Sequence, residues 1–340
     1  MRFFSVAALA CASIAGAASA TRADDFYAGK TITISVHVGV GGTYDSYIRL
    51  LGRYFGRHIP GAPNIVVVNQ LGAGGLLSFN HMARIAPQDG TWLAQVTQSL
   101  IIHELTGQPG MQASLGALKW IGNLSQSNNI AMVWPNSKIR TLADARVSEV
   151  KVGATGVGAT SAQLPALYNA LLGTKFKLII GYKSSAEMDL ACERGELDGR
   201  NVTAWPTFLA GLPQATRARM SAIVQVGLRK DAALPDVPLL SDEVKGDPEK
   251  EAIARFMTLN WIMTRPLATG PGAPPERVEI LRRAFDATMK DPAFLDEAQR
   301  MAAEIDPMSG AEVQNAVAQV LATPKELVKK IQSIIESVGK

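Results

Sequence analysis

The sequence predicts an α/β protein of two lobes, each a mostly parallel sheet flanked by helices. Three observations predict this fold class. The chain has 340 residues, more than a single hydrophobic core usually serves. Segments typical of strands and of helices alternate through short glycine-rich turns, as they do in parallel βαβ units. The order of strand, glycine loop and helix occurs at 32–55 and again at 150–172.

The N-terminal segment has the pattern of a secretory signal peptide. Arg2 precedes an apolar, alanine-rich run, and Ala18-Ser19-Ala20 fits the small-residue cleavage pattern. We therefore expect a signal peptide at 1–20, or one that ends at Ala23, and a mature protein in the periplasm. An N-terminal core helix and a lipoprotein anchored at Cys11 are the alternatives. No later segment approaches the ~20 apolar residues that a membrane-spanning helix needs.

The first lobe is expected to comprise residues 24–124 together with 235–340. Apolar and polar residues alternate from 31 to 38, which predicts a strand. Apolar residues at spacings of three and four then predict an amphipathic helix at 44–55. The following elements are a strand, a helix and a strand at 65–68, 76–85 and 91–97.

The second lobe is expected to comprise residues 125–234. The same reasoning predicts strands at 151–154, 176–180 and 222–226, and helices at 162–172 and 186–194. A proline-containing stretch at 234–240 is interpreted as the return crossing. The remaining helices are expected at 275–289, 293–301, 311–321 and 325–338.

Charge and cysteine content narrow the range of partners. The formal net charge is +4 at pH 7, and the basic residues are scattered instead of forming a track with aromatic residues. Nucleic acid is therefore not an expected partner. After signal cleavage Cys192 is the only cysteine, so no internal disulfide is expected. Its helical spacing from Met188 favours a buried, apolar role.

Three glycine-rich loops are the candidate ligand-binding features, each between a strand and a helix. They are Gly39-Val40-Gly41-Gly42-Thr43, Gly72-Ala73-Gly74-Gly75 and 153–161. Glycine permits a close approach by a ligand, and unpaired N–H groups in the first helical turn suit a carboxylate. The alternative is that the glycines only make tight turns, while Thr43, Thr160 and Ser161 only cap helices.

Asp45 is the one carboxylate that directly follows such a loop. It lies in the first helical turn after Gly41-Gly42, where the helix dipole stabilises it. It is interpreted either as a simple helix cap or as an acceptor for a ligand amine, a hydroxyl or a bridging water.

The main competing functions lack their motifs. Gly153-x-x-Gly156-x-Gly158 reverses the spacing of the dinucleotide fingerprint, and no Walker motif is present. The histidines at 37, 58, 81 and 103 lie in separate elements without metal-ligand spacing. We therefore expect no enzyme activity, no cofactor and no metal site. An exported α/β enzyme stays open as an alternative that requires a polar triad or a metal in the cleft.

A series of short motifs in a fixed order resembles one known family. Phe26-Tyr27-x-Gly29-Lys30-Thr31-Ile32-Thr33 is followed by Gly41-Gly42-x-x-Asp45, Pro60-Gly61-x-Pro63, Asn69-Gln70-x-Gly72-Ala73-Gly74-Gly75 and Ala86-Pro87-x-Asp89-Gly90-Thr91. The later motifs are Gly181-Tyr182, Glu193-Arg194-Gly195-Glu196-Leu197-Asp198-Gly199 and Pro266-x-x-x-Gly270-Pro271. Together they resemble the substrate-binding proteins of tripartite tricarboxylate transporters, also called the Bug (Bordetella uptake gene) family. The resemblance covers nearly the whole mature chain.

The resemblance implies a periplasmic-binding-protein-like fold whose two lobes close on a small organic solute, with a carboxylate expected. Backbone groups and waters of the first loop in each lobe would hold the solute. Carried over position by position, this nominates as ligand-binding residues Gly41, Gly42, Thr43, Asp45 and Gly74 in lobe 1, and Gly156, Gly158, Thr160, Ser161 and Asp198 in lobe 2.

The implied partners are the solute and the membrane permease subunits of a tripartite tricarboxylate transporter, with the binding protein acting as a monomer. The alternative is a sensing role, in which the same clamp presents its solute to a membrane receptor or a sensor kinase.

Overall fold

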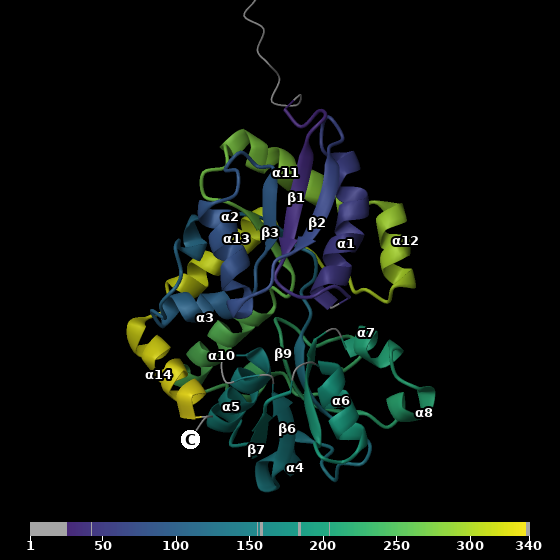
Figure 1. Cartoon of the computed structure of the whole chain (residues 1–340). Helices are drawn as coiled ribbons and strands as arrows, with labels where there is room; N and C mark the ends of the chain where they lie inside the picture. The colour runs from purple at the N-terminus through teal and green to yellow at the C-terminus, as the bar shows by residue number, and fades with distance from the viewer. Residues whose placement is uncertain are drawn as a thin grey trace, which may run out of the picture.

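The protein consists of two α/β lobes, one above the other, in the computed structural model shown in Figure 1. The structure describes residues 26–41, 43–154, 156, 159–182, 185–203 and 205–337, without the side chains of Thr43, Thr207 and Trp261. The predicted signal peptide lies outside these ranges. Among the helices within them, none has the length and apolar character needed to cross a membrane.

Lobe 1 is built on a six-stranded sheet in the order β11-β4-β10-β3-β1-β2. Its strands are β1 (Thr31–Val36), β2 (Asn64–Asn69), β3 (Trp92–Gln95), β4 (Lys119–Asn123), β10 (Pro266–Thr269) and β11 (Met308–Ser309). β1 is parallel to β2 and β3, as the βαβ pattern predicts. β10 is antiparallel to β3 and β4, and β11 is antiparallel to β4. The sheet is mixed because β10 and β11, which come from the C-terminal part of the chain, run antiparallel to their neighbours.

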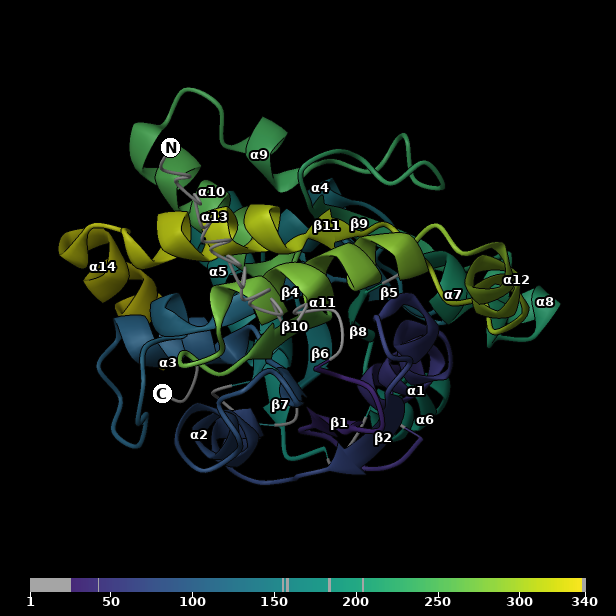
Figure 2. The same ribbon diagram turned by 90° about the horizontal axis from the view of Figure 1, so that it is seen from above.

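The helices of lobe 1 cover both faces of this sheet. They are α1 (Thr43–Phe55), α2 (Leu76–Arg84), α3 (Ser99–Leu105), α11 (Pro275–Thr288), α12 (Pro292–Arg300) and α13 (Gly310–Leu321), with 3₁₀ turns at Gly56–His58, Ala73–Gly75 and Leu115–Ala117. Ile32, Ile34 and Val36 share one hydrophobic core with α1, α11 and α12. α2, α3 and α13 belong to a second core. In the view from above, α1 and α12 lie on one side of the lobe and α2 and α3 on the other (Figure 2).

Lobe 2 is built on a five-stranded sheet in the order β7-β6-β8-β5-β9. Its strands are β5 (Asn129–Val133), β6 (Val150–Ala154), β7 (Phe176–Ile180), β8 (Gly199–Thr203) and β9 (Ser221–Val226). β6 is parallel to β7 and β8, whereas β5 is antiparallel to β8 and β9. Its helices are α4 (Leu142–Val147), α5 (Thr160–Leu172), α6 (Ser185–Glu193), α7 (Trp205–Ala210) and α8 (Gln214–Arg217). Two further helices, α9 (Leu240–Glu243) and α10 (Pro248–Trp261), follow β9 in the segment that the sequence assigned to lobe 1, and both contact β9. The two-lobed α/β fold predicted from the sequence is confirmed.

Cys192 lies on the buried face of α6, as its spacing predicts. Its side chain is fully buried with Met188 and Leu197. Burial raises the pKa of the Cys192 thiol to about 12. A thiol with so high a pKa stays protonated near neutral pH, and protonated thiols are poor nucleophiles.

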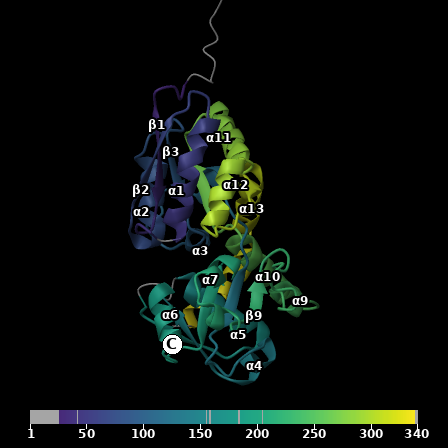
Figure 3. The same cartoon turned by 90° about the vertical axis from the view of Figure 1, so that its right-hand side faces the viewer.

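The chain passes from the lobe 1 sheet to the lobe 2 sheet between β4 and β5 and returns between β9 and β10, and its last helix is α14 (Lys325–Glu336). The sequence grouped α14 with lobe 1, but the helix contacts α5 of lobe 2. The reason is that Ile331 joins the core that α5 and α13 share, and Leu327 and Ile334 pack against that core. The lobe boundaries near 125 and 235 stay a prediction. The side view shows α1, α11 and α12 in one lobe and α6 and α7 in the other (Figure 3).

Candidate functional site

A pocket of about 490 Å³ lies between the lobes and is lined from both. Lobe 1 supplies Tyr44, in the first turn of α1, Gln98, which immediately precedes α3, and Arg265, which immediately precedes β10. Lobe 2 supplies Asn129, Ala159, Thr160, Ser161, Ser185, Met188, Arg200, Asn201, Val202, Thr203 and Phe208. The N-terminal turns of α1 and α5, each of which follows a glycine loop, therefore open onto one shared pocket.

The N-terminus of α5 is suited to an anion. Its N-cap residue is Ala159, which has no side-chain acceptor for the first-turn amides. The helix has 13 residues, so its dipole places partial positive charge at this end. Uncapped N–H groups and that dipole together favour a carboxylate. Thr160 and Ser161, both nominated from the sequence, line the pocket here.

The nominated glycines that the structure describes, Gly41, Gly74 and Gly156, are not among the residues that line the pocket. Gly41 has a φ of 83°, a left-handed conformation that favours glycine, and it leads into α1. Gly156 precedes α5, and a Cβ atom built on it would meet no atom within 4 Å. Gly42 and Gly158 lie outside the described residues, and of Thr43 only the backbone, which begins α1, is described.

Asp45 is part of a hydrogen-bonded cluster that holds the glycine loop. Its carboxylate accepts hydrogen bonds from the Gly41 amide at 2.9 Å, from Arg49 Nε at 2.9 Å and from Asn69 Nδ2 at 2.8 Å. The same Asn69 amide donates to the Val38 carbonyl at 2.8 Å. Asp45 is 1% exposed and does not line the pocket. The structure therefore gives it a positioning role in the loop, and its contact with a ligand stays a prediction.

The electrostatics of Asp45 agree with that role. Burial alone would raise the pKa of this carboxyl group, but the hydrogen bonds from Arg49, Gly41 and Asn69 outweigh burial and lower it. The cluster also explains the spacing of the sequence motif, because Asn69 ends β2 and so connects two neighbouring glycine loops through one carboxylate.

Asp198 lies at the opposite edge of the lobe 2 sheet from the pocket. It immediately precedes β8 and accepts hydrogen bonds from the Lys151 amide and from Ser137 Oγ, both at 2.8 Å. Lys151 lies near the start of β6, whereas α5 follows the other end of that strand. Asp198 therefore joins strands and is not among the residues that line the pocket, and its contact with a solute stays a prediction.

Gly74 lies in the turn between β2 and α2 and is not among the residues that line the pocket. Its φ is 62°, and the neighbouring Gly72 and Gly75 have φ values of 139° and 99°. A Cβ atom on Gly75 would come within 2.7 Å of Thr97 Cγ2. These glycines are thus required by the turn and by its packing.

Sequence reasoning missed Arg265, the most buried charged residue of the pocket lining. Its side chain is 2% exposed, and Nη1 donates to Thr264 Oγ1 at 2.7 Å. The guanidinium lies 3.8 Å from the centroid of the Tyr47 ring. Its positive charge also opposes the rise in the pKa of Tyr44 that burial causes. No motif marks Arg265, since its neighbours in the pocket come from distant segments.

Arg200 was also missed, but this arginine is neutralised. Its Nε and Nη2 atoms contact the two oxygens of Asp189 at 2.5 and 3.0 Å. Its guanidinium also lies 5.1 Å from the Phe208 ring centroid. A bidentate ion pair of this kind leaves little charge for a solute.

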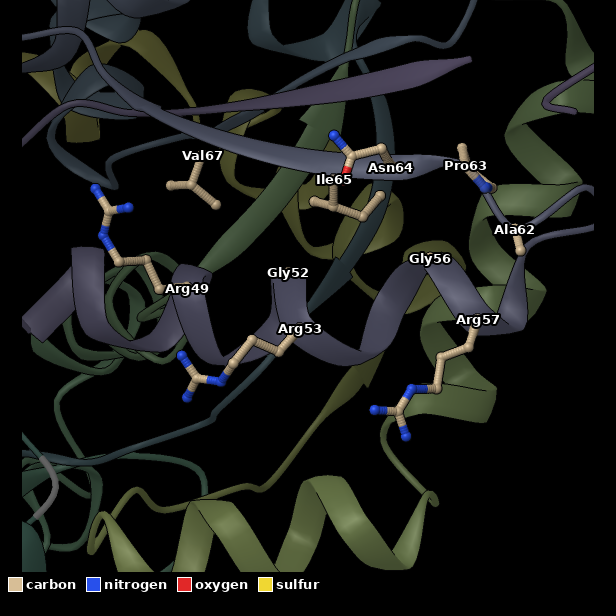
Figure 4. Close-up of a pocket in the computed structure, with 10 residues that line it drawn as sticks. All are labelled: Arg49, Gly52, Arg53, Gly56, Arg57, Ala62, Pro63, Asn64, Ile65 and Val67. Atoms are coloured by element: carbon tan, nitrogen blue, oxygen red, sulfur yellow. The ribbon is translucent and has the colours of Figure 1, made fainter. Parts of the chain in front are cut away.

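Two larger hollows lie outside the cleft. The first, of about 600 Å³, is formed by lobe 1 alone, from α1, β2 and the turn between them, and is lined by Arg49, Arg53 and Arg57 (Figure 4). Each of these arginines has an acidic partner: Asp45 at 2.9 Å, Glu297 at 2.6 Å and Asp291 at 3.9 Å. The second, of about 610 Å³, lies beside the crossing segments and includes Glu304. Neither hollow contains residues from both glycine loops, so the interlobe pocket is the candidate site.

Within the described part of the chain, no group of three or more His, Cys, Asp or Glu side chains is arranged to hold a metal ion.

Comparison with known proteins identifies the family. The family model described as "Tripartite tricarboxylate transporter family receptor" (TctC) matches residues 58–339. The chain therefore belongs to this family, and the resemblance inferred from its motifs is confirmed. A search of curated proteins finds no match.

Solved structures share the fold at low identity. A ligand-free TctC solute-binding protein from Polaromonas is 21% identical, with 89% of this chain and 99% of that chain covered and a TM-score of 0.66. The periplasmic binding protein BugD is 19% identical, with 90% and 99% covered and a TM-score of 0.67. MatC from Rhodopseudomonas palustris, with bound malate, is 18% identical, with 90% and 99% covered and a TM-score of 0.64. The fold is that of periplasmic binding proteins.

Proposed function

We propose that the protein is a periplasmic receptor that captures a small carboxylate between its lobes and delivers it to the permease subunits of a tripartite tricarboxylate transporter. The observation that carries the proposal is the pocket lined by both lobes, onto which the uncapped N-terminus of α5 opens. Membership of the receptor family supports it. Two structural relatives carry malate and adipate, both carboxylates.

The composition of the lining supports capture without chemistry. Among the described residues of the pocket there is no carboxylate, imidazole or thiol to act as a general acid, a general base or a nucleophile. Hydroxyl and amide side chains such as Thr160 and Asn201 instead offer neutral hydrogen bonds. We infer that the solute is bound and released unchanged, and that binding shifts the lobes toward a closed arrangement.

The test is a binding screen on the mature protein after co-purified ligand has been removed. Short mono- and dicarboxylates, hydroxy acids, amino acids and aromatic acids are screened by thermal shift, followed by calorimetry. A true solute at about 100 times its Kd should stabilise the fold by roughly 2.7 kcal/mol. The proposal is refuted if no carboxylate stabilises the protein and mass spectrometry of the natively purified protein finds no bound organic acid.

Delivery to a permease is tested separately by measuring uptake of the identified solute. Deletion of the gene should abolish high-affinity uptake if the receptor serves a transporter. Normal uptake combined with a lost transcriptional response would instead indicate the sensing role.

A further inference from the structure

Arg265 is a buried cation without a counter-charge at the candidate site. It is 2% exposed and forms no ion pair with any described carboxylate. Its Nε atom has no hydrogen-bond partner among the described residues. A guanidinium keeps its positive charge in proteins, and a buried charge is costly to the fold unless it is paired. An anion that pairs with Arg265 would remove this cost, and the described residues do not supply one.

The position of Arg265 is well defined. Its amide donates to Asn123 Oδ1 at 2.8 Å, and its carbonyl accepts from the Leu124 amide at 3.3 Å. Thr264 Oγ1 in turn donates to the Ser125 carbonyl at 2.7 Å. Arg265 is thus connected to the other segment that crosses between the lobes. The Tyr47 ring contacts the guanidinium from α1, which leaves few directions from which a solute can approach.

Glu304 interacts electrostatically with Arg265 but does not form an ion pair with it. Its carboxylate instead accepts a hydrogen bond from Ser127 Oγ at 3.0 Å. The other arginine of the pocket, Arg200, is paired with Asp189. Among the described pocket residues, Arg265 is therefore the one cation whose charge is left for a solute.

We propose that Arg265 is the specificity-determining residue of the site, whose guanidinium pairs with a carboxylate of the solute and so selects acids over their uncharged analogues. This inference rests on the proposed function, since it assumes that the solute occupies the interlobe pocket. A carboxylate matches the planar fork of a guanidinium in two parallel hydrogen bonds, which an amide or an ester cannot reproduce.

The experiment compares acid and amide pairs, such as hexanoate with hexanamide, adipate with adipamide and benzoate with benzamide. The pair that contains the best acid of the screen is titrated into wild type, Arg265→Gln and Arg265→Lys. Loss of a charge-assisted pair should weaken acid binding about 10- to 100-fold in Arg265→Gln while amide binding changes little. Arg265→Lys keeps the charge without the fork, so we expect intermediate affinity and continued preference for the acid.

Arg277→Gln is the matched control. Arg277 also stacks on an aromatic ring, with its guanidinium 3.5 Å from the Phe26 ring centroid, but it does not line the pocket. This variant should bind the acid as wild type does. If Arg265→Gln does not fold, the acid affinities of Arg265→Lys and the wild type are compared to test the assignment.

The outcomes separate the two proposals. If no acid binds the wild-type protein, the proposed function itself fails. If an acid binds the wild type and Arg265→Gln keeps both its affinity and its preference for acid over amide, the assignment of Arg265 is wrong while the proposed function stands. If only Arg265→Lys folds, wild-type affinity for the acid in that variant overturns the assignment, because lysine lacks the forked pair.

Discussion

At the scale of single residues, Asp45 shows how a buried carboxylate stabilises a loop from within. Three donors from the β1–α1 loop, from α1 and from β2 converge on it. The carboxylate therefore determines where the first turn of α1, and with it Tyr44, stands relative to the pocket. A substitution at Asp45 should change stability first and binding only as a consequence.

We predict that Asp45→Asn lowers the free energy of unfolding by about 1–3 kcal/mol, because buried donors lose a charged acceptor. The pKa of Asp45 is lowered in the folded state, so its contribution is complete above the ordinary aspartate pKa of about 4 and is lost as the pH falls below it. The wild-type protein should therefore lose stability on acidification more steeply than Asp45→Asn. Thermal unfolding at a series of pH values measures both effects.

Asp296→Asn, on the exposed side of α12, is the control and should unfold as the wild type does at every pH. Parallel pH profiles for the wild type and Asp45→Asn would contradict the role given to Asp45.

The sequence pointed to residues that line the pocket where local pattern determines their position. Thr160 and Ser161 line the pocket because a glycine loop and a helix start are adjacent in sequence. Arg265 and Arg200 could not be predicted as pocket residues, because the residues around them come from remote parts of the chain. Tyr47, for example, lies over 200 positions from Arg265 in the sequence. A lone arginine beside a proline carries no signal of its own burial.

At the scale of elements, periodicity located the helices and strands with strong patterns. The segment 31–38, where apolar and polar residues alternate, contains β1, and the segment 44–55, with its helical spacing of apolar residues, lies in α1. β4, β5, β8, β10 and β11 were not predicted, because they are short and several lack alternation. Asn129–Val133, for example, is buried at all of its positions, as is common in central strands.

At this scale the proposed anion-binding feature is the N-terminus of α5, which Gly156 precedes. We predict that Gly156→Val weakens binding of the solute by at least tenfold, while stability stays within about 0.5 kcal/mol of wild type. A Cβ atom at this position meets no atom within 4 Å, so the fold should accept the side chain, which then obstructs the solute. Calorimetric titration and thermal unfolding measure the two effects.

Gly42→Val should act likewise on the lobe 1 side, although that residue lies outside the described ranges. Unchanged affinity in both variants would place the site elsewhere.

At the scale of the whole molecule, two lobes of similar construction were predictable from the repeated order of strand, glycine loop and helix. The position of α14 was not, since an amphipathic helix needs an apolar partner but does not specify which one. A single hydrophobic core includes Trp120 of lobe 1, Met257 of α10 and Leu167 of lobe 2. The lobes thus share packing on one side of the molecule and form the pocket between them.

This architecture implies a trade between stability and function at Arg265. The unliganded protein holds a buried guanidinium whose charge no described carboxylate balances, and that costs free energy. We predict that Arg265→Met, which keeps much of the side-chain volume, unfolds at a higher temperature than wild type without solute. The gain should be roughly 2–4 °C for each kcal/mol recovered, less what the lost Tyr47 contact contributes. With saturating solute the order of the two unfolding temperatures should reverse, because only the wild type gains the carboxylate pair.

Thermal unfolding of both proteins with and without the best acid of the screen measures this reversal. If Arg265→Met is less stable than wild type without solute and both gain equally from it, the guanidinium is a structural element of the hinge, and its charge is balanced within the fold.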